Sequence, residues 1–183
     1  MNNFDRFSIA PRSGLLRRVT AICLIIWSAS LPLNLAQAGT YSIPMDKSVA
    51  EIDVPDSWNP NSSDLGVDAA SPDNKLFFSI YSTKNKDEKV ALRDASVIFA
   101  DGQVLQIDIN SLEKQTVDIG SIPTHQYGYD TKMNGKPGHI AISLAKVKTG
   151  GYLQIIRWGT RKSLSRNYPG SQKIFKSLKL LGY

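Results

Sequence analysis

Alternating apolar and polar side chains mark six strands along the chain. In the second of them Leu76, Phe78 and Ile80 recur at every other position, the period of a strand with one buried face. The predicted strands cover residues 49–54, 75–82, 113–119, 122–133, 137–148 and 152–160. Asn134-Gly135 and Thr149-Gly150-Gly151 separate the last three, and both are strong hairpin signals. The last four strands are therefore expected to form an antiparallel meander.

Two stretches change to the period of an amphipathic helix. The first covers residues 86–101, where Asn85 and Glu88 resemble a capping box and one stripe is apolar: Ala91, Leu92, Ala95, Ile98 and Phe99. The second covers residues 171–180, with apolar side chains on one side: Ile174, Phe175, Leu178 and Leu181. The sum predicts an α+β domain in which helices cover a mostly antiparallel β-sheet.

The two histidines are too far apart to share a metal ion. A two-residue loop at Asn134-Gly135 sets His139 opposite Asp130 and His125 opposite Leu144. The histidines are then roughly 17 Å apart and on opposite faces of the pleat. The pattern therefore predicts no metal site, and it favours a solvated cross-strand ion pair of His139 with Asp130 over an acid/base pair.

The N-terminus has the three parts of a secretory signal. Four arginines precede an apolar run at residues 19–35, and Ala36-Gln37-Ala38 supplies the small residues that a signal peptidase reads. Ser28, Ser30, Pro32 and Asn34 interrupt the run, which falls short of the ~20 apolar residues of a spanning helix. We expect a signal peptide at residues 1–38, cleaved near Ala38 rather than kept as an anchor, and a periplasmic or secreted product.

Cleavage leaves residues 39–183 as a single domain without a cysteine, because Cys23 is removed with the signal. Charge is distributed unevenly along this domain. Residues 39–130 carry 7 basic and 15 acidic side chains, whereas residues 131–183 carry 11 basic and no acidic ones. One interpretation is that the two halves interleave and neutralise each other. The other is a basic face for an acidic partner or for anionic lipid headgroups.

The basic face would lie at the end of the last strand and on the closing helix. Its candidate partner-binding residues are Arg157, Arg161, Lys162, Arg166, Lys173, Lys176 and Lys179. The last three recur every three residues, so a helix would bring them together. In the simplest register of the second hairpin, Leu144 pairs with Ile155 and Ile142 with Arg157. Arg157 then shares a row of side chains with core residues, so its charge must be paired or must face a cleft. The alternatives are that this row has already left the core at the end of the strand, or that the other row of the strand faces inward.

The order of these elements resembles the PsbP-like fold. The resemblance rests on Ile52-Asp53-Val54-Pro55-Asp56-Ser57-Trp58, on the Ala70-Ser71-Pro72-Asp73 turn before an apolar strand, on the helix and meander, and on the closing Ile174-Phe175-Lys176-Ser177-Leu178-Lys179. It covers nearly all of residues 41–181. That fold is shared by photosystem II extrinsic proteins, a Ran-binding import factor, DcrB-type envelope proteins and some effector chaperones. The resemblance implies a non-enzymatic protein-binding module, without naming its partner.

Known catalytic motifs are missing from the sequence. It has no G-x-S-x-G elbow, no S-x-x-K with companion motifs and no cysteine after the signal. We therefore expect an exported, non-enzymatic binding or accessory module of the cell envelope, with a protein partner and with no cofactor or nucleic acid. Two alternatives are a peripheral binder of anionic lipid that uses the basic C-terminal region, and a small hydrolase, which would need a pocket of converging polar groups.

Overall fold

The structure is a computed structural model that describes residues 37–44, 47–100, 105–133, 135–148 and 150–181. The signal predicted for residues 1–38 lies almost wholly outside these residues, so its cleavage stays a prediction. No helix in the described part of the chain is long and apolar enough to cross a membrane.

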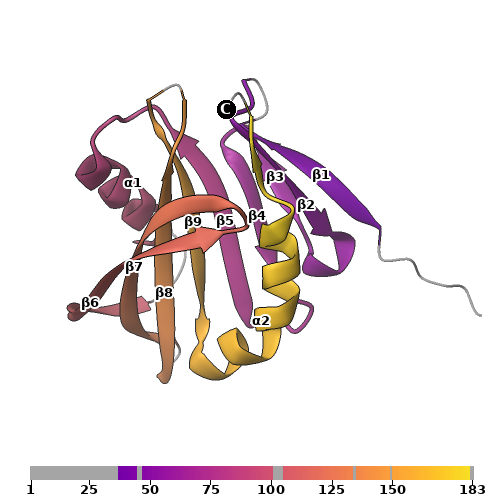
Figure 1. Cartoon of the computed structure of the whole chain (residues 1–183). Coiled ribbons are helices and arrows are strands. Elements are labelled where there is room, and N and C mark those ends of the chain that lie inside the picture. The colour runs from indigo at the N-terminus through magenta and orange to yellow at the C-terminus, as the bar shows by residue number, and fades with distance from the viewer. Residues whose placement is uncertain (1–36, 45–46, 101–104, 134, 149, 182–183) are drawn as a thin grey trace, which may run out of the picture. The chain divides into compact units, whose positions relative to one another are not determined.

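Seven strands form the larger sheet, in the order β3-β4-β5-β9-β8-β7-β6 (Figure 1). Every neighbouring pair is antiparallel. The strands from β6 to β9 form the predicted meander, and β9 then pairs with β5, so the two halves of the chain meet inside the sheet. The strands are β3 Asn61–Ser63, β4 Gly66–Ala70, β5 Leu76–Thr83, β6 Leu105–Ile119, β7 Ile122–Met133, β8 Lys136–Lys146 and β9 Tyr152–Thr160.

A smaller sheet joins the two ends of the described chain. It contains β1 (Ala38–Ile43), β2 (Ala50–Pro55) and β10 (Lys179–Leu180), with β2 in the middle. Both pairings are antiparallel, and the Leu181 N–H donates to the Val49 carbonyl at 2.8 Å. A single 3-10 turn, Asp56–Trp58, follows β2.

The two helices cover opposite faces of the larger sheet. α2 (Arg161–Lys176) contributes Phe175 to one apolar cluster, and α1 (Glu88–Ala100) contributes Ala91 to the other. Adjacent β9 residues divide between the two, because Ile155 belongs to the α2 cluster and Ile156 to the α1 cluster. Since both faces are covered, β9 buries both of its side-chain rows, and the fold is α+β as predicted.

Several predicted elements are confirmed to the residue. β7 and β9 have the expected bounds. The first hairpin has the expected register, with His139 opposite Asp130 and His125 opposite Leu144. The histidines thus lie five pairs apart along β7 and β8.

The register predicted for the second hairpin is wrong by one residue. Leu144 pairs with Gln154, and Arg157 pairs with Ala141. The cause is a three-residue connection in place of a two-residue loop: the Gly150 N–H donates to the Val147 carbonyl at 2.9 Å, and φ of Gly150 is +90°. Such a left-handed residue is typical of three-residue hairpin loops.

The bounds predicted for the closing helix are also wrong. α2 begins ten residues earlier, at Arg161, and ends at Lys176, because the chain then turns into β10. Thr160 caps its start by accepting a hydrogen bond from the Ser163 N–H at 3.2 Å. The helix runs through Pro169, and Gly170 beside it packs so closely on Trp58 that an added Cβ would lie 3.1 Å from the indole ring.

Candidate functional site

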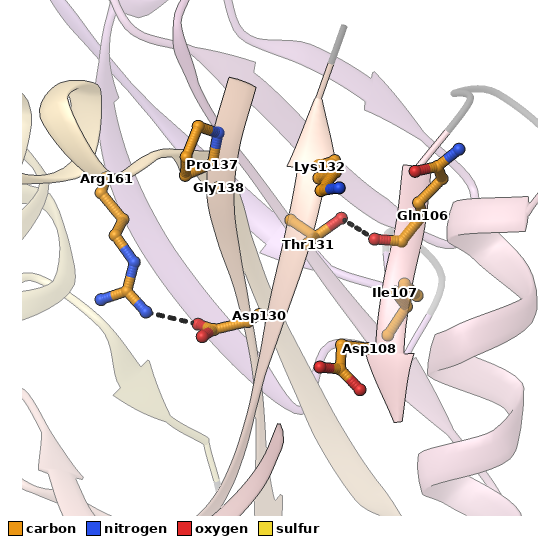
Figure 2. Close-up of a pocket in the computed structure, with 9 residues that line it drawn as sticks. All are labelled: Gln106, Ile107, Asp108, Asp130, Thr131, Lys132, Pro137, Gly138 and Arg161. Carbon is orange, nitrogen blue, oxygen red and sulfur yellow. Dashed lines mark hydrogen bonds and ion pairs between the residues drawn. The ribbon is translucent and has the colours of Figure 1, made fainter. Parts of the chain in front are cut away.

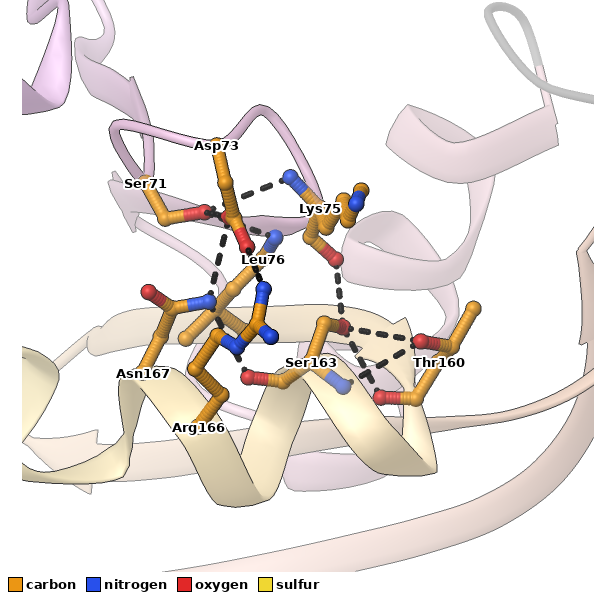
Figure 3. A network of polar contacts seen from close by, with 8 residues as sticks. All are labelled: Ser71, Asp73, Lys75, Leu76, Thr160, Ser163, Arg166 and Asn167. Atoms are coloured by element: carbon orange, nitrogen blue, oxygen red, sulfur yellow. Dashed lines mark hydrogen bonds and ion pairs between the residues drawn. The ribbon is translucent and has the colours of Figure 1, made fainter.

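A polar network fixes the first half of α2 to the turn between β4 and β5 (Figure 3). The Ser163 hydroxyl donates to the Lys75 carbonyl at 2.6 Å, and the Asn167 amide donates to Asp73 at 3.1 Å. The Ser71 hydroxyl donates to the same carboxylate at 2.6 Å. These bonds set the position of the cationic side chains on the first two turns of α2.

Asp73 is the acidic centre of this network. The hydrogen bond from Ser71 lowers the pKa of Asp73 below its ordinary value, and it outweighs burial, which acts in the opposite direction. Arg166 on α2 lies 3.7 Å from the other carboxylate oxygen. The carboxylate therefore stays charged at neutral pH and holds Arg166 beside the turn.

A hollow of about 900 Å³ opens next to the network, between the β4–β5 turn, the β7–β8 hairpin and the start of α2. One of its lining residues, Asp73, is acidic and five are basic. This basic hollow is defined by Lys75, Lys136, Arg161, Lys162 and Arg166. The first turn of α2 contains no acidic residue, so nothing there offsets the positive end of the helix dipole.

Arg161 also borders a second hollow, of about 420 Å³, between β6, β7 and β8 (Figure 2). Its guanidinium lies 2.6 Å from Asp130, and His139 lies 3.4 Å from the same carboxylate oxygen. The Asp130 side chain is 47% exposed, so this is the solvated cross-strand pair that the sequence favours. It joins the acidic half of the chain to the basic half.

The predicted basic face is divided in the structure. Arg161, Lys162 and Arg166 gather at the basic hollow. Lys173 and Lys176 lie in the last turn of α2, away from it. The hypothesis that a helix brings Lys173, Lys176 and Lys179 together is wrong for the third, because Lys179 lies in β10 opposite Glu51. Sequence reasoning missed Lys75 and Lys136, which complete the hollow.

Arg157 does not line the basic hollow but a different one. It follows Leu153 and Ile155 on the face of β9 that α2 covers, and its neighbour across the strands is Phe78. Its guanidinium is 5.3 Å from the ring of Phe175. Arg157 thus lies in a core-facing row of β9, as predicted, although the register differs. The other row of β9 side chains, which the alternative placed toward the core, is buried too.

No protein-family model matches the sequence, and no curated protein matches it. Solved structures do resemble it. The solution structure of cyanobacterial PsbP (CyanoP) from Synechocystis sp. PCC 6803 is 12% identical, with a TM-score of 0.51 over 81% of this chain and 95% of that one. The chain has a PsbP-like fold.

LpqN, involved in cell envelope biogenesis of Mycobacterium tuberculosis, is a weaker likeness to this PsbP-like chain. It is 13% identical, with a TM-score of 0.49 over 79% of this chain and 91% of that one. At these identities the PsbP-like likeness concerns the fold, and function must be argued from the site.

One further cluster of this PsbP-like domain has the residue types of a catalytic site. Glu88, at the start of α1, accepts hydrogen bonds from Tyr127 and from His125, the latter at 2.8 Å. Lys114 lies 3.8 Å from the same carboxylate. The helix is capped by Asp87, whose side chain accepts from the Lys89 N–H at 2.7 Å, and not by Asn85 as predicted. With Asp87 forming the cap, Glu88 is free to tie the helix to β6 and β7.

We interpret the Glu88 cluster as a structural anchor. Burial alone would raise the pKa of Glu88, but the hydrogen bonds from Tyr127 and His125 outweigh it and lower the pKa. A lowered carboxyl pKa makes the carboxylate an acceptor at neutral pH and a poor proton donor. Within the described residues, no group of three or more His, Cys, Asp or Glu side chains is placed to hold a metal ion.

Glu88→Gln is expected to lower the free energy of unfolding by about 1–2 kcal/mol at pH 7, because hydrogen bonds to a charged acceptor are lost. Since folding lowers this pKa, the stabilisation is complete above the ordinary value of 4.5 and is lost as the pH falls through the folded pKa. In urea denaturation from pH 7 to pH 3, the difference in the free energy of unfolding between Glu88→Gln and the parent should disappear below about pH 4.5. The control is Glu113→Gln, an exposed carboxylate on β6. A difference in the free energy of unfolding that stays constant from pH 7 to pH 3 would contradict the role of Glu88 as a charged anchor.

Proposed function

We propose that this protein is an exported, non-enzymatic accessory module of the cell envelope, and that the basic hollow binds an acidic segment of a protein partner. The carrying observation is the set of five cations around one hollow. The protein's own acidic half supplies ion pairs to Arg161 and Arg166. Among the described residues, Lys136 and Lys162 have no ion-pair partner, and both are exposed. The N-terminal signal pattern supports export.

The shape of the hollow favours a polypeptide over a membrane. Its basic side chains come from a turn, a hairpin and a helix end that surround a concave space. A flat layer of lipid headgroups would reach the rim of such a space, whereas an extended acidic segment can enter it. The attraction is long-range, so it would act on the association rate and weaken with salt.

Two triple variants test this proposal with equal changes in charge. Lys75, Lys136 and Lys162 to Gln removes three cations from the basic hollow, and Lys173, Lys176 and Lys179 to Gln removes three elsewhere. We expect crosslinking to the envelope partner in intact cells to fall about tenfold in the first variant and little in the second. Thermal unfolding should be similar for both, because all six lysines are exposed.

Equal crosslinking by the two variants and the parent would exclude the hollow as the docking site. The lipid alternative is tested separately, by sedimentation with vesicles of anionic and of neutral lipid. Salt-sensitive sedimentation that depends on Lys75, Lys136 and Lys162, without a crosslinked protein, would replace the protein partner by a membrane surface.

A further inference from the structure

Arg157 is a partly buried cation that packs against the core of the protein. It lies in β9 between β5 and β8, opposite Phe78 and Ala141, on the face that α2 covers. Its Nε atom is buried and has no hydrogen-bond partner. Among the described residues, no carboxylate lies within ion-pair distance of it. Its contact is the ring of Phe175, 5.3 Å away, which attracts the cation but accepts no conventional hydrogen bond.

A partly buried arginine without a carboxylate partner contributes little to stability. Burial lowers the pKa of Arg157, and the nearby Tyr168 hydroxyl opposes that effect. A guanidinium nevertheless stays charged in proteins, so the buried part of its surface is desolvated without a carboxylate partner. An apolar side chain of similar length would fill the same space without this cost.

A hollow of about 360 Å³ lies against this guanidinium, beneath one side of α2. Its walls combine apolar side chains, Leu76 and Leu164, with the hydroxyl-bearing Ser165, Tyr168 and Ser171. Tyr168 and Ser165 are exposed, so the hollow is open to solvent at that end, whereas Ser171 is buried. The volume is within the range of small-molecule sites.

We propose that Arg157 and this hollow bind a carboxylate carried on a small apolar group. The guanidinium fork of Arg157 matches the two oxygens of a carboxylate. Among the described residues, Arg157 is the one cation lining the hollow, so a singly charged group is neutralised and a doubly charged phosphate is not. The apolar walls receive the rest of the ligand. The carboxylate belongs either to a free small acid or to the C-terminus of a peptide.

This site is separate from the basic hollow, because the two share no lining residue. The proposal therefore does not rest on the docking function. Arg93, an exposed arginine on α1 that lines neither hollow, provides a matched control.

The test is a titration of the ¹⁵N-labelled protein with sodium butyrate, followed at the backbone amide resonances of Ser165, Tyr168 and Ser171, which line the hollow, and in the parent also at the Arg157 Nε–Hε resonance. We expect saturation with a Kd of about 1 mM, as befits so small a ligand. Arg157→Met should weaken binding at least about tenfold, while Arg93→Met binds like the parent. Neutral butyramide and inorganic phosphate should bind more weakly than butyrate.

A peptide that ends in Leu with a free carboxylate distinguishes the two sources of the carboxylate, with the peptide amide as its control. Binding of this peptide that is tighter than that of butyrate identifies the C-terminus of a peptide as the ligand. Weaker binding identifies a free small acid.

Stability separates a binding role from a structural one. Arg157→Met should be at least as stable as the parent, because it replaces a partly buried cation that lacks a carboxylate partner by an apolar side chain. A parent that does not respond to butyrate, together with a destabilised Arg157→Met, would show that Arg157 serves the fold and would overturn the proposal. So would Arg157→Met binding butyrate like the parent. Butyramide or phosphate binding as tightly as butyrate would also overturn it.

Discussion

Phe175→Ala is expected to lower the free energy of unfolding by about 3–5 kcal/mol. The ring is 1% exposed, and it lies 5.4 Å from the ring of Phe78. It joins α2 to both sheets, since its cluster includes Ile52 from the smaller sheet and Ile155 from the larger one. The space left by the ring cannot close easily, because polar bonds fix the helix to the β4–β5 turn at its other end.

Chemical denaturation measures the effect, and Phe77→Ala is the control. Phe77 is the neighbouring residue on β5, but it is partly exposed and stacks on Trp158. Phe77→Ala should lower the free energy of unfolding markedly less than Phe175→Ala, because less apolar area is removed from the core. If Phe175→Ala cost no more than Phe77→Ala, the described docking of α2 would be wrong.

Gly151→Ala is expected to lower the free energy of unfolding by about 3 kcal/mol, at the upper end of the cost of overpacking. A Cβ at this position would lie 2.0 Å from the carbonyl oxygen of Thr83. That atom belongs to the backbone of β5, which pairs with β9 from Leu76 to Thr83. The clash therefore cannot be relieved without separating two central strands.

Gly135→Ala provides the comparison for this effect. Gly135 has φ of +75°, but nothing lies within 4 Å of the position of its Cβ. Gly135→Ala should lower the free energy of unfolding by about 1 kcal/mol, because of the left-handed backbone alone. Thermal unfolding of both variants separates crowding from backbone strain. A similar loss in the two would mean that β5 and β9 are not as close as described.

These glycines also show where sequence reasoning is strong and where it fails. The loop at Gly135 is governed by local chemistry, so the register of its hairpin was predicted correctly. The next loop contains two glycines, and the simplest register counted it one residue too short. The observed connection is closed by the Gly150 N–H, which donates to the Val147 carbonyl, and two adjacent glycines do not tell a two-residue loop from a three-residue one. Gly151 also packs against Thr83, a contact between segments distant in sequence that local patterns cannot indicate.

The closing helix illustrates the same limit. Pro169-Gly170 is a pair that ordinarily ends a helix, and the closing helix was predicted to begin only after it, at residue 171. In the structure, the helix continues through the pair, with Gly170 against Trp58 and a capped start at Thr160. Tertiary packing outweighs local propensity here. The short strands β1, β3 and β4 were missed because they lack a clear apolar alternation.

The candidate site could be predicted only in part. Arg161, Lys162 and Arg166 follow one another on α2 and were identified from the run of basic residues. Lys136 could have been found from the hairpin register, because β8 begins where β9 ends. Lys75 could not, since its place depends on the pairing of β5 with β9 across an intervening helix and three strands.

The smaller sheet has a consequence for the time course of folding. Leu180 pairs with Ala50, so a loop of about 130 residues closes when β10 adds to β2. Ile174, Phe175 and Leu178, which precede β10, belong to the same core as β2. A chain still emerging from a ribosome or a translocation channel lacks these residues, and its apolar face stays uncovered until synthesis or transport is finished. Contacts this distant in sequence also slow folding, which gives the incomplete chain a long period as a substrate for chaperones.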